Sequence, residues 1–202
     1  RLGADFLRDP VTAAPVLDYL RALHGEILKT NLAFNRVVKE ASGNRVAVGN
    51  YGGYFFGMHF GPEHRHFYNA QLLRSGLVDF QMSPFMYSQF RKMGEAGWAE
   101  NMFESPAMHG VMGILEADTS THLDTDKARK LSHIIPDNSR DASMLLARDF
   151  GQVLARKAGI HWKDFNRQFY DDDDIQNTFS VFSHINQLPT TANKLKSSVV
   201  MV

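Results

Sequence analysis

The pattern that most constrains the fold is an alternation between stretches with a helical hydrophobic period and short apolar runs. Residues 15–41 carry apolar side chains three and four positions apart, and Gly43 follows, which predicts a long amphipathic helix that ends at a glycine. Four runs are typical of buried strands: residues 45–51, 77–82, 111–116 and 160–165. Helices are predicted between and after these runs, at residues 65–74, after Ser105, at residues 141–157 and from the acidic run 171–174 to Pro189.

A helix followed by four strand–helix repeats predicts an α/β fold with a parallel sheet and right-handed crossovers. A doubly wound sheet would give the same alternation, but its nucleotide-binding forms usually have a glycine-rich turn after the first strand. The one candidate turn, residues 49–53, contains Tyr51 where a pyrophosphate needs close approach of the backbone, so it is weak evidence for a nucleotide. A complete (β/α)8 barrel needs about 250 residues. With 202 residues and four strands, the chain is expected to form half of such a barrel.

Composition excludes several classes of partner. The 22 basic and 22 acidic residues balance, and Lys and Arg are scattered along the chain, which argues against a nucleic-acid partner. No apolar run approaches the roughly 18 residues that a membrane span needs, so no membrane partner is expected. Because the chain has no cysteine, disulfides and thiol catalysis are excluded.

The third strand run ends on acidic residues. Residues 111–116 are apolar up to Glu116, and Asp118 follows in a polar loop. Because chemistry in parallel α/β folds is concentrated at the carboxyl ends of the strands, both carboxylates are expected where a substrate can reach them. The alternative is an ordinary strand whose terminal acids face water.

Four segments, in this order along the chain, resemble the carboxy-terminal half of the barrel in β-galactosidase-like glycoside hydrolases of clan A, with family 42 as the nearest group. The segments are residues 45–56 (RVAVGNYGGYFF), 73–84 (LRSGLVDFQMSP, with Tyr87 after it), 116–123 (EADTSTHL) and 158–165 (AGIHWKDF). The resemblance implies that the chain is the second half, strands five to eight, of a (β/α)8 TIM barrel. Residues 1–190 would form this half-barrel, and residues 191–202 would be a linker and the start of a following domain.

The resemblance places Glu116 at the end of the seventh barrel strand, which is the position of the nucleophile in a retaining glycosidase. A retaining mechanism also needs a second carboxyl group, about 5 Å away, as acid and base. In clan A that group follows the fourth strand in an Asn-Glu pair, and no such pair occurs in these 202 residues. The missing amino-terminal half-barrel is therefore expected in the same chain before Arg1, or from a homo-oligomer.

The resemblance also assigns substrate-binding residues. Tyr87 matches a region whose tyrosine hydrogen-bonds the nucleophile, and the alternative is a loop tyrosine that caps the core. Trp162 matches an aromatic platform for a sugar ring, and the alternative is a tryptophan packed between strand and helix. Ser120 stands where many relatives have an arginine, which removes a cationic donor. The full set of expected sugar-binding residues is Tyr51, Tyr54, Tyr87, Asp118, His122 and Trp162.

The expected activity is hydrolysis of β-galactosides, or of a related plant or algal oligo- or polysaccharide, without a cofactor or metal. Two alternatives from other classes remain: a non-catalytic carbohydrate-binding half-barrel or scaffold module, and an unrelated α/β domain with a nucleotide or small-molecule ligand. A strand that ends in Asn-Glu upstream of Arg1 would favour the enzyme. A fold that is complete from its first residue would favour the carbohydrate-binding module. Phosphate bound at residues 49–53 would favour the unrelated α/β domain.

Overall fold

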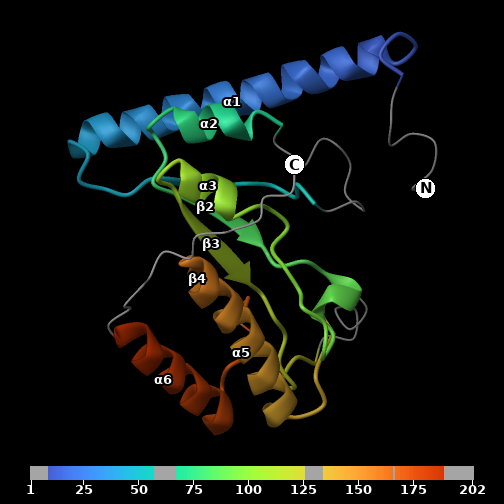
Figure 1. The fold of residues 1–202 in the computed structure, drawn as a ribbon, viewed down its shortest axis with the longest axis vertical. Coiled ribbons are helices and arrows are strands. Elements are labelled where there is room, and N and C mark those ends of the chain that lie inside the picture. The colour runs from blue at the N-terminus through green and yellow to red at the C-terminus, as the bar shows by residue number, and fades with distance from the viewer. Residues whose placement is uncertain (1–8, 57–66, 126–133, 166, 189–202) are drawn as a thin grey trace, which may run out of the picture.

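A computed structural model describes residues 9–56, 67–125, 134–165 and 167–188 (Figure 1). The chain folds into a parallel sheet with helices packed against it. The elements in chain order are α1 (Ala14–Ser42), β1 (Gly49–Tyr51), α2 (Asn69–Arg74), β2 (Phe80–Pro84), the 3-10 turn η2 (Ser88–Arg91), α3 (Glu104–Met108), β3 (Met112–Ala117), α5 (Ser139–Arg156), β4 (Gly159–Trp162) and α6 (Asp173–Gln187).

The sheet has four strands in the order β1-β2-β3-β4, and all neighbouring pairs are parallel. This confirms the parallel α/β sheet expected from the alternating pattern. The strands lie across the sheet in chain order, without the reversal of order that a doubly wound sheet has. Right-handed crossovers between strands in such an order put the connecting helices on one side of the sheet. The architecture is therefore compatible with half of an α/β barrel.

Side chains alternate between the two faces of the sheet, and only one of these faces carries the main core. Leu115, Ala117 and Ile160 pack with α5 and α6 side chains, including Leu146, Phe150 and Phe182. The opposite face, here called the open face, carries the alternate positions Phe80, Met82, Met112, Ile114, Glu116 and His161. Met112 on this face is 48% exposed and His161 is also exposed. In a closed barrel the open face would point inward.

Helix α1 lies across one end of the molecule beside α2 (Figure 1). Leu28 and Leu32 of α1 pack against a small cluster formed by Leu72, Leu73, Val78 and Val111. The buried Asn35 donates from its side-chain amide to Asn50 Oδ1 in β1 at 2.6 Å. The helix ends as expected at Gly43, whose φ of 59° is left-handed.

Helices α5 and α6 pack against each other and against β3 and β4 (Figure 1). Each begins at a side-chain cap: Asn138 accepts from the Asp141 amide, and Asp172 accepts from the Asp174 and Ile175 amides. Their contact centres on Phe150 and Phe182, whose rings stack at 4.3 Å. Helix α5 runs from Ser139 to Arg156 with Lys157 in the left-handed conformation, against the predicted 141–157. Helix α6 begins inside the acidic run, as predicted, with Asp172 as its cap.

The strand boundaries also differ from the prediction. The run at residues 45–51 is a strand only from Gly49, and the run at residues 77–82 becomes a strand only at Phe80. Just before both strands, the Asp79 carboxylate accepts from the Val48 amide at 2.7 Å and from Lys39 Nζ, so a side chain contributes to the contact between the two segments there. Strand β4 ends at Trp162 rather than at Phe165.

Some expectations fall on residues that the structure does not describe. Residues 191–202, expected as a linker and the start of another domain, lie outside the described part, and so does the expected beginning of a helix at residues 65 and 66. None of the helices in the described ranges is long and apolar enough to cross a membrane.

Candidate functional site

All four strands end at the same edge of the sheet, and Glu116 lies at this edge. Glu116 is the penultimate residue of β3, and its neighbours in register are Pro84 of β2 and His161 of β4. Residues paired in register share a face, so the Glu116 side chain belongs to the open face. It is only 6% exposed, which shows that neighbouring side chains shield this carboxylate.

Lys163 is the cation that contacts Glu116. Its Nζ donates to Glu116 Oε1 at 3.1 Å, and its backbone amide donates to the Ala117 carbonyl at 3.0 Å. The ammonium group also lies 4.6 Å from the centre of the Phe165 ring. Sequence analysis did not single out Lys163, because the fourth strand was predicted to run to residue 165, which placed Lys163 in its middle, whereas β4 ends at Trp162.

Asp118 lies two residues beyond Glu116 and pairs with a fully buried arginine. Arg91 is 0% exposed, and its Nη2 donates to Asp118 Oδ1 at 2.5 Å while its Nη1 donates to the Asp118 carbonyl at 3.1 Å. The Phe85 and Met86 carbonyls accept the remaining guanidinium hydrogen bonds at 3.0 and 2.7 Å. Arg91 therefore ties the segment after β2 to the end of β3.

Two tyrosines complete this group. The Tyr87 ring centre lies 4.4 Å from the Arg91 guanidinium carbon and 6.4 Å from the Tyr54 ring centre. Burial, the nearby Asp118 charge and Tyr54 raise the pKa of the Tyr87 phenol above its ordinary value, so the phenol stays protonated and can donate. We refer to Tyr54, Tyr87, Arg91 and Asp118 as the carboxyl-edge cluster.

A second carboxyl group lies near this edge. Glu100 is 1% exposed, its amide donates to the Pro84 carbonyl at 2.8 Å, and its Oε2 has no hydrogen-bond partner among the described residues. Pro84 is also the register partner of Glu116, so the β2 backbone lies between Glu100 and Glu116. Two spacings between neighbouring strands put the Glu100 and Glu116 backbones roughly 10 Å apart. Burial raises the pKa of Glu100 to about 7 against the opposing charge of Arg91. Sequence analysis missed Glu100 because it comes from an irregular segment.

The segment after Asp118 is held by its own hydrogen bonds. Thr119 donates to the buried Asp149 of α5 at 2.6 Å, Ser120 donates to Asp124 at 2.7 Å, and Thr121 donates to the Phe169 carbonyl. Ser120, where the resemblance implied an arginine, is thus a buried structural contact here. His122 Nε2 lies 3.4 Å from Asp172, the residue that caps α6.

Trp162 reaches the same edge of the sheet but lies on the other face from Glu116. Its register partner is Ala117, and its ring packs against Tyr170, Phe179 and Phe182 at centroid distances of 6.5, 5.1 and 6.1 Å. The expectation of a sugar platform beside Glu116 is therefore replaced by the alternative, a tryptophan packed between strand and helix. Alternation along β4 explains the placement, because the neighbouring residues His161 and Lys163 take the open face.

The structure thus brings most of the expected residues to one edge. Tyr51 ends β1 on the open face, since it pairs with Met82, and Tyr54 and Tyr87 lie side by side next to Asp118. His122 lies farther along, against α6. No group of three or more His, Asp or Glu side chains within the described ranges is placed to hold a metal ion.

No protein-family model, no curated protein and no solved structure matches the chain.

Proposed function

We propose that the chain is the second half, strands five to eight, of a (β/α)8 barrel glycoside hydrolase that acts with retention of anomeric configuration. Glu116 is its nucleophile, and its substrates are β-galactosides or a related plant or algal oligo- or polysaccharide. The observation that supports this most strongly is a shielded glutamate at the carboxyl end of a parallel strand, on the open face, beside buried polar groups.

The surrounding groups suit a carboxylate that attacks an anomeric carbon. Lys163 fixes one Glu116 oxygen, which leaves the other oxygen to form the glycosyl–enzyme bond. The Arg91–Asp118 pair holds the segment that follows Glu116, so the nucleophile keeps its orientation. Tyr51, Tyr54 and Tyr87 offer hydroxyl groups and ring faces to a sugar on the same edge.

The second carboxyl of the retaining pair is assigned to the other half of the barrel. That half is supplied by the same polypeptide or by a second copy of the chain, and it covers the open face. The 202-residue chain alone is then expected to hydrolyse little or nothing, since leaving-group protonation needs the partner carboxyl.

The test is turnover of an aryl β-galactoside with a good leaving group by the full-length protein. Glu116→Gln keeps the shape and removes the attacking charge, so kcat should fall by roughly 10³-fold or more. Asp118→Asn breaks the buried pair with Arg91 and so costs stability, but in folded protein it should lower kcat less than Glu116→Gln does. Glu26→Gln on the exposed surface of α1 is the matched control that should not change kcat. A fluorosugar should label Glu116 covalently. Near wild-type turnover by Glu116→Gln, or labelling of another residue, would refute the assignment.

One observation favours a second candidate, the non-catalytic carbohydrate-binding module. The Lys163 ammonium at 3.1 Å neutralises the Glu116 carboxylate, which is the arrangement of a structural ion pair. Under this alternative the full-length protein binds galactosides but leaves the activated substrate intact, and the fluorosugar does not label it.

A further inference from the structure

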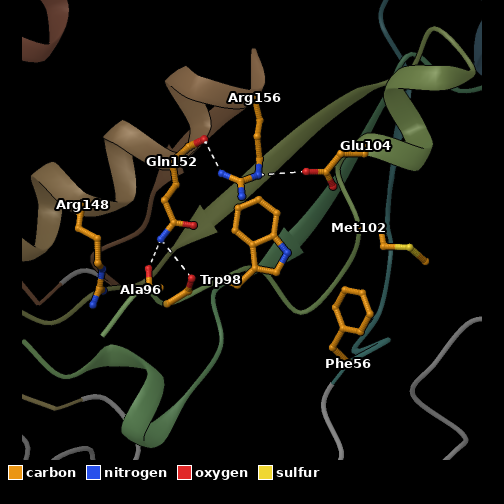
Figure 2. Close-up of a pocket in the computed structure, with 9 residues that line it drawn as sticks. Phe56, Ala96, Trp98, Met102, Glu104, Arg148, Gln152 and Arg156 are labelled. Carbon is orange, nitrogen blue, oxygen red and sulfur yellow. Dashed lines mark hydrogen bonds and ion pairs between the residues drawn. The ribbon is translucent and has the colours of Figure 1, made fainter. Parts of the chain in front are cut away.

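A pocket of about 600 Å³ lies on the helix side of the molecule, between α5 and the segment that leads from η2 to α3 (Figure 2). This volume is within the range of small-molecule sites. It is distinct from the open face that carries Glu116. The residues that matter for its chemistry are Phe56, Trp98, Met102, Glu104, Gln152 and Arg156.

Arg156 is held at this pocket with one terminal nitrogen to spare. Its guanidinium lies flat against Trp98, with its central carbon 3.7 Å from the ring centre. Nε donates to Glu104 Oε1 at 3.1 Å and Nη1 donates to the Gln152 carbonyl at 3.3 Å, as the dashed lines in Figure 2 show. Nη2 donates to no acceptor in the described part of the chain. The guanidinium is therefore oriented before any ligand binds.

Trp98 supplies a second unused donor. No acceptor within the described ranges takes its indole N–H, and Figure 2 shows the indole nitrogen facing the side where Met102 and Phe56 lie. The side chains of Phe56 and Met102 are exposed and apolar. The pocket thus combines spare hydrogen-bond donors with an apolar wall. It is suited to a ligand that has hydrogen-bond acceptors on one side and an apolar C–H face on the other.

The charge of the lining favours an anion. Arg148 is already paired with the buried Asp149 at 2.9 Å, so Arg156 is the lining cation that can meet a ligand, and it is opposed by Glu104, which is exposed at the rim. Exposed ion pairs contribute little free energy, so a ligand anion can replace the Glu104 carboxylate at the guanidinium. Gln152 is not available as a donor to the ligand, because its amide donates to the Ala96 and Gly97 carbonyls.

We propose that this pocket binds an anionic sugar residue, whose carboxylate or sulfate accepts hydrogen bonds from the Arg156 guanidinium and whose ring oxygens accept from the Trp98 indole. The C–H face of the pyranose packs on Phe56 and Met102. The proposal goes beyond the hydrolytic function and does not depend on Glu116. The shared chemistry is an anion on a pyranose, and glucuronic acid and galactose 6-sulfate are the two sources to compare.

The experiment is a titration of the ¹⁵N-labelled chain, followed through its two tryptophan indole N–H signals, with Trp162→Phe assigning them. Glucuronic acid or galactose 6-sulfate should shift the Trp98 signal and leave the Trp162 signal in place, because Trp162 packs against α6. Arg156→Gln should weaken binding by about 10-fold or more, the effect of losing one charge-assisted hydrogen bond. Arg140→Gln, an exposed arginine near the start of the same helix, is the matched control and should bind as the parent does.

The outcomes separate the parts of the proposal. If glucuronic acid alone binds, the carboxylate is the ligand group, and if galactose 6-sulfate alone binds, the sulfate is; both support the site. Equal shifts with neutral galactose would overturn the role of the anion. Equal shifts with inorganic sulfate alone would overturn the role of the sugar. No shift with any of the probes, or unchanged affinity in a correctly folded Arg156→Gln, would overturn the site. Loss of hydrolysis in Glu116→Gln has no bearing on these signals.

Discussion

Arg91 shows how a full charge can be accommodated inside a small α/β chain. It is buried with no exposed surface, and four acceptors satisfy its guanidinium, one of them the Asp118 carboxylate. Removing one partner of such a pair leaves the other charge buried and uncompensated, which costs far more than the pair contributes.

Arg91→Met should therefore lower the free energy of unfolding by about 3–5 kcal/mol. Urea denaturation followed by circular dichroism measures this. The control is Arg21→Met, since Arg21 pairs with Asp18 on the exposed surface of α1 and should change stability by less than about 1 kcal/mol. Equal losses of unfolding free energy in the two variants would show that burial of the Arg91–Asp118 pair does not make it more important for stability than an exposed pair.

Glu100 makes stability depend on pH in the neutral range. Its pKa rises from 4.5 in an ordinary setting to about 7 in the fold, so between these values the folded chain binds more protons than the unfolded chain. The free energy of unfolding should fall as pH rises from about 4.5 to 7, by an amount on the order of 2 kcal/mol. Glu100→Gln should flatten this part of the profile in urea titrations at pH 5 and pH 8. If the free energy of unfolding of Glu100→Gln fell with pH as it does in the parent, another titrating group would be responsible for the pH dependence.

Sequence reasoning at the residue scale found side chains that stand next to strand ends and missed those that depend on tertiary partners. Glu116 and Asp118 were found because an apolar run predicts where a strand ends. Arg91 and Glu100 carry no such signal, since an arginine and a glutamate in a long loop are ordinarily solvated. Trp162 was assigned to the wrong face, because alternation separates two faces but does not say which one the helices cover.

At the scale of elements, helix starts depend on single side chains. Asn138 is the N-cap of α5, and its Oδ1 accepts from the Asp141 amide at 2.9 Å. Asn138→Ala should lower the free energy of unfolding by about 1 kcal/mol. Asn177→Ala in the exposed middle of α6 removes the same side chain without a cap and should change little or stabilise slightly. If thermal denaturation showed equal losses of stability in Asn138→Ala and Asn177→Ala, the side-chain cap would not be what stabilises the start of α5.

The helices were predicted well and the strands only as approximate positions. A helix such as α1 repeats its apolar period over 29 residues, so the signal accumulates, whereas β1 has three residues. Directly before β2, the Asp79 carboxylate contacts Val48 and Lys39, which lie 31 and 40 residues away. A contact of that kind is invisible to a local pattern.

At the scale of the whole molecule, the open face is the feature that most affects behaviour in solution. Met112 and Tyr51 lie exposed on it beside Phe80 and Ile114. Exposed apolar sheet surface favours association with further protein, so the 202-residue chain should self-associate as concentration rises. Sedimentation velocity measures this.

Met112→Glu should weaken that self-association by placing a charge on the open face. The matched control is Met108→Glu in α3, which is exposed but lies outside the sheet and should leave association unchanged. A chain that sediments as a 22.8 kDa monomer at all concentrations would contradict the idea that the open face needs a partner.

The strand order has a consequence for how the chain acquires its structure in time. Each strand pairs with the next one along the sequence, so the sheet can grow one strand–helix unit at a time, but every parallel pairing joins residues far apart in the chain, such as Gly49 with Phe80 and Ile114 with Gly159, and such pairing is intrinsically slow. The contacts at the carboxyl edge span separations of the same order: Arg91 reaches Asp118 across 27 residues, and Lys163 reaches Glu116 across 47. Lys163 can arrive only after β4 has docked, so Glu116 should gain its ion-pair partner among the last events of refolding.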